Sequence, residues 1–235
     1  MPTPEEIERM AYATRSKRNR ALILMLYTTG LRVSTLRALK INDVIEEMNR
    51  GLSIIKIPVY PEMKGRISEA CKGGIPYYTF ASPEAVEALK EYLDERSKKY
   101  GSLNDGEPLF CSDTTNLPVE ARVRKPIIQK AVQQIIKRAA KDAGIKRWRD
   151  VTPHCMRKAF ESALRNNGLD IKDQEFLMVV DAAFTSIGLN YFTAVVPKVE
   201  EFNKKFVESG KIKNLKDLAE ADINELRKIW ENKRS

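Results

Sequence analysis

Residues 18–34, RNRALILMLYTTGLRVS, contain the longest apolar run of the chain, Ala21–Tyr27. The run predicts a helix over residues 18–28, and Gly30 just beyond it is typical of a helix C-terminus. A bilayer-spanning helix takes about 20 apolar residues, so this run is far too short to cross a membrane. We therefore expect a helix of a globular core, followed by a turn that presents one arginine, Arg32.

Further helices are expected on both sides of this core helix. Clear N-terminal signals lie at Thr3, where a Pro and two Glu follow in a capping box, at Ser82 and at Thr152, each followed by Pro. Apolar residues at helical spacing follow each signal. Two more helices are expected over residues 34–39 and 129–143, the second of which stops at a glycine.

The β signal is confined to one stretch. Residues 52–57 alternate weakly between apolar and polar, and residues 75–80 (IPYYTF) are aromatic and β-branched. The polar loop between them, residues 61–74, carries three basic residues: Lys64, Arg66 and Lys72. The predicted fold class is therefore α+β and mainly α, with a small antiparallel sheet attached to a helical body.

Composition and charge narrow the classes of function. The 235 residues include 41 Lys and Arg against 32 Asp and Glu, a formal net charge of +9, which favours an acidic polymer as partner. The three cysteines, Cys71, Cys111 and Cys155, are scattered, and the chain has one histidine, so neither a disulfide framework nor a metal site is expected. The N-terminus lacks a signal-peptide pattern. We expect a cytoplasmic protein with no cofactor and no membrane partner.

Three residues near helix ends stand out as candidates for anion binding. Arg32 follows a tight turn, where a guanidinium can grip an oxyanion with two parallel donors. His154 and Arg157 lie three residues apart at a helix start, so they share one face. Met156 and Phe160 point elsewhere, and we expect the His154/Arg157 face to turn away from the core. Free N–H groups in a first helical turn also suit a phosphate.

Two further candidates are weaker by themselves. Lys72 lies in Cys-Lys-Gly-Gly, where glycines permit a tight hairpin tip that carries the lysine toward a ligand. Tyr191 follows a helix-like stretch, and a lone tyrosine is usually a core residue. In isolation, each of these residues has an ordinary structural explanation.

Together, their order resembles the catalytic domain of the tyrosine recombinases, the phage integrase family. The resemblance rests on residues 29–34 (TGLRVS), then Lys72, then His154-x-x-Arg157, then Tyr191 followed by Phe. The strand after the lysine is similar to that of archaeal integrases. The resemblance implies the mainly helical catalytic fold of that family, over residues 1–196. A C-terminal helical tail, residues 197–235, would pack in cis or in trans, and the family's N-terminal core-binding domain is expected to be absent.

The resemblance also implies roles for these residues. Arg32 and Arg157 would clamp the scissile phosphate of double-stranded DNA, and His154 would add a hydrogen bond or assist proton transfer. Lys72 would protonate the departing 5′ oxygen, and Tyr191 would attack phosphorus to give a 3′-phosphotyrosyl intermediate, without metal or ATP. Lys64 competes with Lys72 for the acid role. Further DNA contacts are expected from Lys64, Arg66 and Lys158, and a homo-oligomer, a tetramer on DNA, is implied.

The chain departs from the family pattern at two places. Residues 177–182 (LMVVDA) stand where the family has Leu-Gly-His or Met-Gly-His, so no His or Trp donor is available there. Thr35 replaces the acidic residue that follows the first arginine. These departures keep two alternatives open: a DNA-binding protein of the same fold that has lost catalysis, and a type IB topoisomerase-like enzyme that relaxes DNA without exchanging strands.

Overall fold

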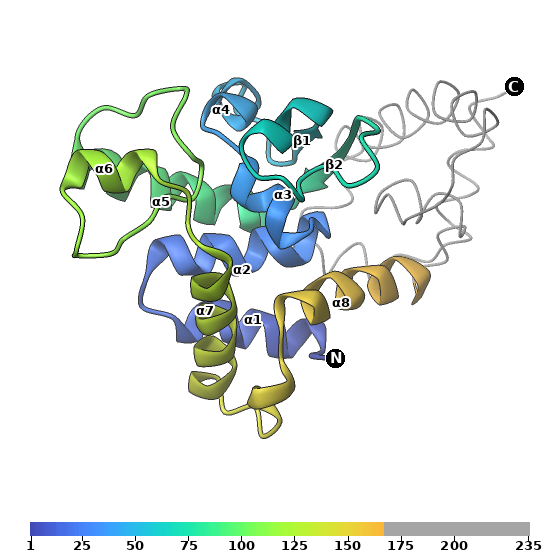
Figure 1. The fold of residues 1–235 in the computed structure, drawn as a ribbon. Coiled ribbons are helices and arrows are strands. Elements are labelled where there is room, and N and C mark those ends of the chain that lie inside the picture. The colour runs from blue at the N-terminus through green and yellow to red at the C-terminus, as the bar shows by residue number, and fades with distance from the viewer. Residues whose placement is uncertain (167–235) are drawn as a thin grey trace, which may run out of the picture. The chain divides into compact units, whose positions relative to one another are not determined.

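The computed structural model describes residues 1–166. Its elements, in chain order, are α1 (Pro4–Ala13), α2 (Lys17–Thr29), α3 (Val33–Ala38), α4 (Asn42–Asn49), β1 (Ile55–Val59), the 3₁₀ helix η1 (Pro61–Gly65), β2 (Tyr77–Ala81), α5 (Pro83–Tyr100), α6 (Val119–Arg124), α7 (Gln129–Asp142), the 3₁₀ helix η2 (Trp148–Asp150) and α8 (Pro153–Asn166) (Figure 1). The predicted fold class, α+β and mainly α, is confirmed. The predicted boundary at residue 196 and the tail after it lie outside the described residues.

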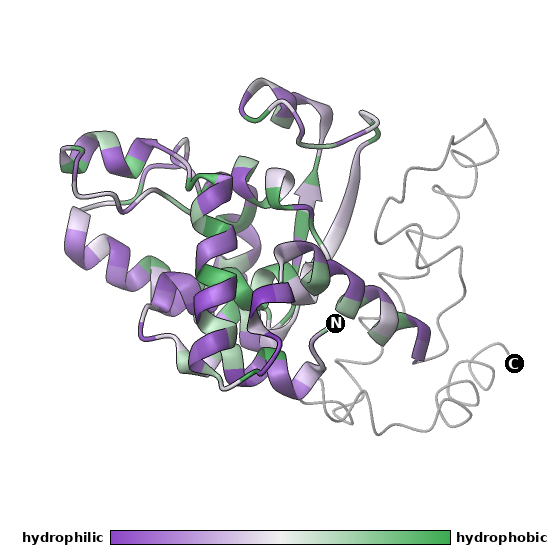
Figure 2. Ribbon diagram, turned by 60° about the horizontal axis from the view of Figure 1, so that its bottom comes forward, coloured by the Kyte–Doolittle hydropathy of each residue, from purple (hydrophilic) through white to green (hydrophobic). Residues whose placement is uncertain are grey.

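Helix α2 forms the centre of the core. Every residue from Ala21 to Leu26 is buried, so the helix is enclosed on all sides rather than along one stripe. It packs against α1, α5 and β2. In Figure 2 the hydrophobic segments, in green, gather in the interior of the described ribbon. Among residues 1–166, no helix combines the length and the apolar character that a membrane span requires.

The predicted helix starts are confirmed. At Thr3 the capping box is complete, because the Glu6 amide donates to Thr3 Oγ1 at 3.2 Å and the Thr3 amide donates to Glu6 Oε2 at 2.9 Å. The Ala85 amide donates to Ser82 Oγ at 3.4 Å, and α8 begins at Pro153. These local bonds satisfy amides that a helix leaves unpaired at its first turn.

The two strands pair antiparallel, as predicted, with Ile57 opposite Thr79 and Val59 opposite Tyr77. The first strand begins at Ile55 rather than at residue 52, and the segment between the strands contains η1 rather than a plain loop. On β2 the side chains of Tyr77, Thr79 and Ala81 are buried. Thr79 Oγ1 donates to the Thr29 carbonyl at 2.8 Å, which ties the sheet to the C-terminal end of α2.

Two helices, α4 and α6, were not predicted. Helix α4 buries only Val44 and Met48, and α6 buries only Val123. Such short helices offer too few apolar positions for a periodic pattern. Tertiary contacts rather than intrinsic helix signals explain them.

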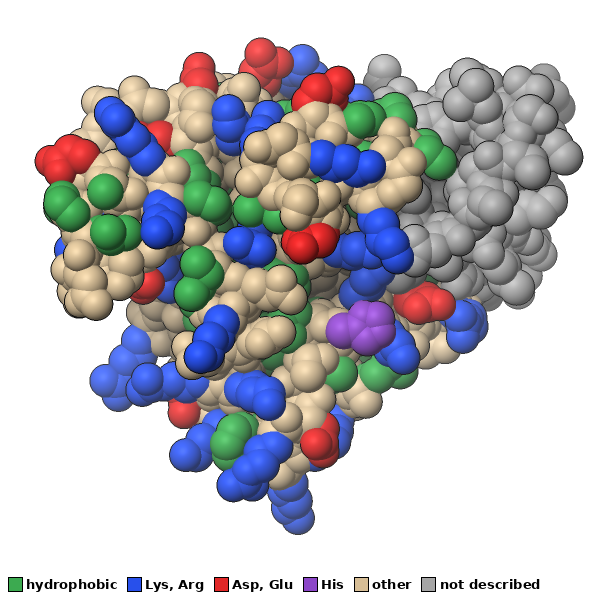
Figure 3. Space-filling model, in the orientation of Figure 1, with side chains coloured by type: hydrophobic (Ala, Val, Ile, Leu, Met, Phe, Trp, Pro, Cys, Tyr) green, Lys and Arg blue, Asp and Glu red, His purple; other side chains and the backbone are tan. Residues whose placement is uncertain are grey.

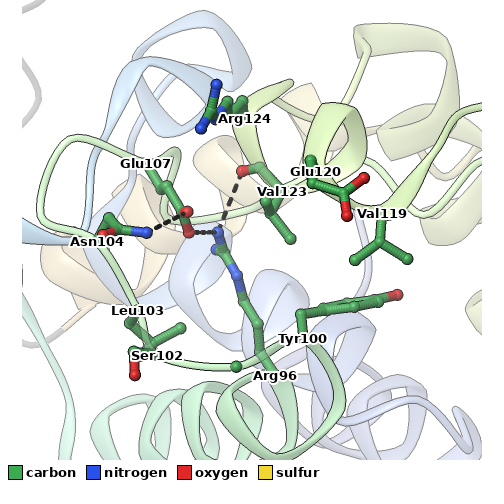
Figure 4. A pocket seen from close by; sticks show the side chains of 11 residues that line it. Arg96, Tyr100, Ser102, Leu103, Asn104, Glu107, Val119, Glu120, Val123 and Arg124 are labelled. Atoms are coloured by element: carbon green, nitrogen blue, oxygen red, sulfur yellow. Dashed lines mark hydrogen bonds and ion pairs between the residues drawn. The ribbon is translucent and has the colours of Figure 1, made fainter.

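Arg96 of α5 holds the long segment after that helix. The residue is 2% exposed, and Nη2 lies 2.7 Å from Glu107 Oε2 and 3.2 Å from the Val123 carbonyl (Figure 4). Nη1 donates to the carbonyls of Pro108 at 2.7 Å and of Leu109 at 3.2 Å. One buried guanidinium therefore joins α5, the 107–109 segment and α6.

Arg96→Met should destabilise the protein strongly, because the Glu107 carboxylate and the carbonyls around it lose a buried cationic partner. We expect the free energy of unfolding to fall by about 3–5 kcal/mol in urea titrations. Lys98→Met is the matched control, since its pair with Asp94 on the same helix is exposed and contributes about 0–1 kcal/mol. Equal losses in the two variants would contradict the structural role of Arg96.

Candidate active site

The site is organised around the glycine that ends α2. Gly30 adopts φ +61°, the left-handed conformation that glycine tolerates best. A Cβ on Gly30 would lie only 2.7 Å from Phe160 Cε1, so the absence of a side chain also lets α8 pack closely on this turn. The chain then reverses, and Arg32 becomes the residue that precedes the first turn of α3.

Arg157 reaches the same turn from α8. Its side chain is buried, with 8% exposed, and Nη1 donates to the Gly30 carbonyl. The prediction that Arg157 shares an outward face with His154 is therefore wrong: His154 is exposed and Arg157 is not. Arg157 turns inward because of a contact with another helix. The C-terminal end of α2 is the negative end of its dipole and attracts the guanidinium.

Arg32 and Arg157 both act electrostatically on the side chain of Tyr77. Burial raises the pKa of the Tyr77 phenol above its ordinary value, and the positive charges of Arg157 and Arg32 act on it in the opposite direction. Both guanidiniums are thus within electrostatic range of one phenol at the start of β2. The structure brings the two predicted arginines to the same region.

Lys72 lies at an exposed position on the turn before β2. Cys71, just before it, adopts φ +45°, which is rare for a residue with a side chain, and its thiol donates to the Ile75 carbonyl at 3.2 Å. Ser34 of α3 donates to the Glu69 carbonyl at 3.0 Å and anchors the base of this segment next to Arg32. The turn therefore has a fixed base and a tip that carries Lys72.

Lys64, the competing candidate, comes from η1 and lies beside the same turn. Its Nζ is 3.3 Å from the position that a Cβ on Gly74 would take. Both lysines are exposed. The fold therefore places the two candidate acids in one neighbourhood, and the choice between them stays a prediction.

Arg66 is held by internal contacts. Its Nη1 lies 3.0 Å from Asp43 Oδ2 and 2.9 Å from the Ala38 carbonyl, and its Nη2 donates to Tyr60 Oη at 2.6 Å. Tyr60 in turn donates to Asp43. These bonds connect η1 to α3 and α4, so the geometry gives Arg66 a structural role, and its contact with DNA stays a prediction.

The exposed face of α8 is basic. His154 and Lys158 are exposed and one helical turn apart. In Figure 3 the histidine, in purple, lies on the surface, and Lys and Arg side chains, in blue, lie on the same face of the molecule. Tyr191, the predicted nucleophile, lies outside the described residues, as do residues 177–182.

The site residues offer cations and hydrogen-bond donors rather than metal ligands. Within residues 1–166, no group of at least three His, Cys, Asp or Glu side chains is arranged to hold a metal ion. Guanidiniums are donors that suit oxyanions and phosphates. The arrangement can therefore bind a phosphate group with protein side chains.

Comparison with known proteins decides the family. A model described as "Phage integrase family" matches residues 2–178. The chain belongs to the phage integrase family. The resemblance predicted from the ordered motifs is thereby confirmed.

Individual relatives are tyrosine recombinases. The chain is 30% identical over 183 residues to tyrosine recombinase XerC of Lactobacillus leichmannii, covering 75% of this chain and 53% of the relative. It is 29% identical to tyrosine recombinase XerA of Thermococcus kodakarensis, covering 72% and 50%. The chain thus spans about half the length of the curated relatives it matches. The crystal structure of XerA recombinase matches with a TM-score of 0.56 at 26% identity, covering 80% of this chain and 62% of that one.

Several positions that shape the site were not predicted from the sequence. Tyr77 was recognised only as an aromatic strand residue, and Ser34 only as the start of a helix. The contact between Gly30 and Phe160 joins segments far apart in the chain. The sequence does carry a signal that Tyr77 is buried, because Tyr77 falls on the buried positions of the predicted strand. It carries no signal for which residues surround Tyr77 in the fold.

Gly30→Ala should destabilise the protein more than Gly51→Ala does. Both glycines have positive φ, +61° and +71°, so both variants acquire backbone strain of about 1–2 kcal/mol. Only at Gly30 does the new methyl group collide with Phe160, whereas nothing lies within 4 Å at Gly51. We expect an additional loss of about 1–3 kcal/mol for Gly30→Ala in denaturant titrations. Equal losses would show that α8 does not pack on this turn as described.

Proposed function

We propose that this chain acts as the catalytic domain of a site-specific DNA recombinase, which cleaves and rejoins DNA strands through Tyr191. The observation that carries the proposal is the position of Arg32 and Arg157 at the end of α2, within electrostatic range of the same phenol. The names of the relatives, tyrosine recombinases at about 30% identity, support DNA as the substrate. So does the net charge of +9.

The chemistry needs fixed positive charge at one phosphate. Transfer of a DNA phosphoryl group passes through a pentavalent state with negative charge on the non-bridging oxygens, and preorganised donors lower that barrier. The bond from Arg157 to the Gly30 carbonyl fixes this guanidinium before substrate arrives. Arg32 is the residue between the Gly30 turn and the first turn of α3. Together they bind the phosphate without a costly rearrangement.

Bond breaking then needs a nucleophile and an acid. The Tyr191 phenol oxygen attacks phosphorus and forms a phosphotyrosyl ester, while the bond to the 5′ oxygen breaks. Lys72 gives that oxygen its proton, and His154 donates a hydrogen bond to the phosphate or assists transfer of the phenol proton. Because the ester conserves the energy of the phosphodiester, a 5′ hydroxyl of a partner strand can reverse the step without ATP.

Binding along the duplex would use exposed basic side chains outside the chemical centre. Lys158 lies next to His154 on the outer face of α8, and Lys64 lies at the end of η1. Strand exchange between two duplexes needs more than one protomer, so we propose assembly of a homo-oligomer, a tetramer, on DNA. A DNA-binding protein that has lost catalysis is the second candidate, favoured by residues 177–182, which lack the family's His or Trp donor.

A nicked suicide duplex tests the covalent step. The wild-type chain should form a protein–DNA adduct that persists in denaturing detergent, and Tyr191→Phe should form none. Lys72→Ala should slow adduct formation at least 100-fold relative to the wild type, whereas Lys64→Ala should slow it less than 10-fold. The reverse order would move the acid role to Lys64. Duplex binding with no adduct would favour the catalytically inactive alternative, and plasmid relaxation without recombinant products would favour the topoisomerase-like one.

Two substitutions test which basic residues contact DNA and which support the fold. We expect Lys158→Gln to weaken DNA binding and Arg66→Gln to lower stability. Lys158→Gln should weaken duplex binding and lower the slope of log affinity against log salt by about 1, with unchanged unfolding. Arg66→Gln should lower the free energy of unfolding by about 1–3 kcal/mol, because the half-buried Asp43 network loses its cation. Fluorescence anisotropy and urea titration measure the two effects. An Arg66→Gln variant with wild-type stability and weakened binding would instead place Arg66 on the DNA.

A further inference from the structure

Among residues 1–166, the phenol of Tyr77 is a buried polar group without a hydrogen-bond partner. Its side chain is 5% exposed, and within the part of the chain that the structure describes its oxygen has no hydrogen-bond partner. Buried polar groups are nearly always paired, since an unpaired one loses its bonds to water and gains nothing in return. The position of Tyr77 therefore requires an explanation.

Its position follows from the strand register. Tyr77 and Thr79 point to the same buried face of β2, because side chains two residues apart share a face. Thr79 donates to the Thr29 carbonyl, and the next carbonyl, that of Gly30, accepts from Arg157. Tyr77 thus lies one step along β2 from the end of α2, on the side nearer the Lys72 turn.

The charges around Tyr77 are those of the proposed phosphate site. Arg157 and Arg32 both act on its phenol. Burial raises the pKa of Tyr77, so the phenol keeps its proton at neutral pH and remains a donor. A neutral O–H donor beside two guanidiniums can bind an anion that those guanidiniums attract.

We propose that Tyr77 Oη donates a hydrogen bond to the phosphate oxygen that Arg32 and Arg157 bind, as a third protein donor at the scissile phosphate. This inference rests on the proposed function and adds a phosphate-contacting residue to it. It explains why the hydroxyl is buried unpaired: its partner arrives with the substrate. It also supplies a donor in a chain whose residues 177–182 contain neither His nor Trp.

Tyr77 is a donor in this proposal and not a second nucleophile. A nucleophilic phenol must lose its proton as it attacks, and the raised pKa of Tyr77 opposes that loss. The bond-forming oxygen remains that of Tyr191. A variant that lacks the Tyr77 hydroxyl should therefore still form the adduct, but more slowly.

Tyr77→Phe removes the hydroxyl and keeps the ring. The first measurement is the shift of the thermal unfolding midpoint with added inorganic phosphate, at constant ionic strength, for the purified chain. The wild type should be stabilised by phosphate, and Tyr77→Phe should show a dissociation constant for phosphate about 5- to 10-fold higher. Without phosphate the variant should be at least as stable as the wild type. Tyr78→Phe, on the opposite face of β2, is the matched control and should keep wild-type phosphate binding.

The second measurement is the rate of adduct formation on the suicide duplex, which should fall about 10- to 100-fold in Tyr77→Phe and stay unchanged in Tyr78→Phe. Wild-type phosphate affinity in Tyr77→Phe, or no phosphate binding by the wild type, would overturn the inference. So would an unchanged rate of adduct formation. If phosphate binding depends on Tyr77 but no Tyr191 adduct forms, this inference stands and the proposed recombinase activity fails.

Discussion

The last carbonyl of α2, that of Thr29, and the carbonyl of the next residue, Gly30, organise the site. An α-helix leaves its final carbonyls without helical partners, and here both are used by distant segments. The Thr29 carbonyl accepts from Thr79 of β2, and the Gly30 carbonyl accepts from Arg157 of α8. The bonds that complete the core helix are thus the bonds that bring the sheet and α8 to the turn that carries Arg32. Stability and site geometry depend on the same contacts.

This arrangement explains why so buried an arginine is tolerated. A guanidinium with 8% exposure is expensive to desolvate unless it is paired. The negative end of the α2 dipole and a carbonyl bond offset that cost, and the packing of Phe160 against Gly30 positions α8 for the contact. The Gly30 carbonyl is a neutral main-chain acceptor for this buried cation. A neutral carbonyl positions the arginine without cancelling its positive charge.

The sequence predicted what local signals determine. The apolar run at Ala21–Tyr27, the capping box at Thr3 and the proline-initiated helices were all found, because each depends on neighbours within a few residues. Helices α4 and α6 were missed because they bury one or two side chains each. The orientation of Arg157 was wrong because helical periodicity describes one helix, and its partner is the end of another. The sequence also could not predict that the buried Tyr77 hydroxyl has no partner within residues 1–166, since only tertiary structure shows its surroundings.

Lys64 and Lys72 are both candidates for the general acid, because their positions in the sequence do not distinguish them. The fold places them on differently supported segments. Lys64 follows Met63 on η1, which the Arg66–Asp43–Tyr60 bonds fix against α3 and α4. Lys72 lies at an exposed position on a turn whose base is anchored by the bond from Ser34 to the Glu69 carbonyl. A general acid has to approach an oxygen that becomes basic only as the bond breaks, so some motion of its ammonium group is useful. An exposed lysine on such a turn is suited to that approach, so the assignment of the proton to Lys72 and of the DNA backbone to Lys64 stays a prediction.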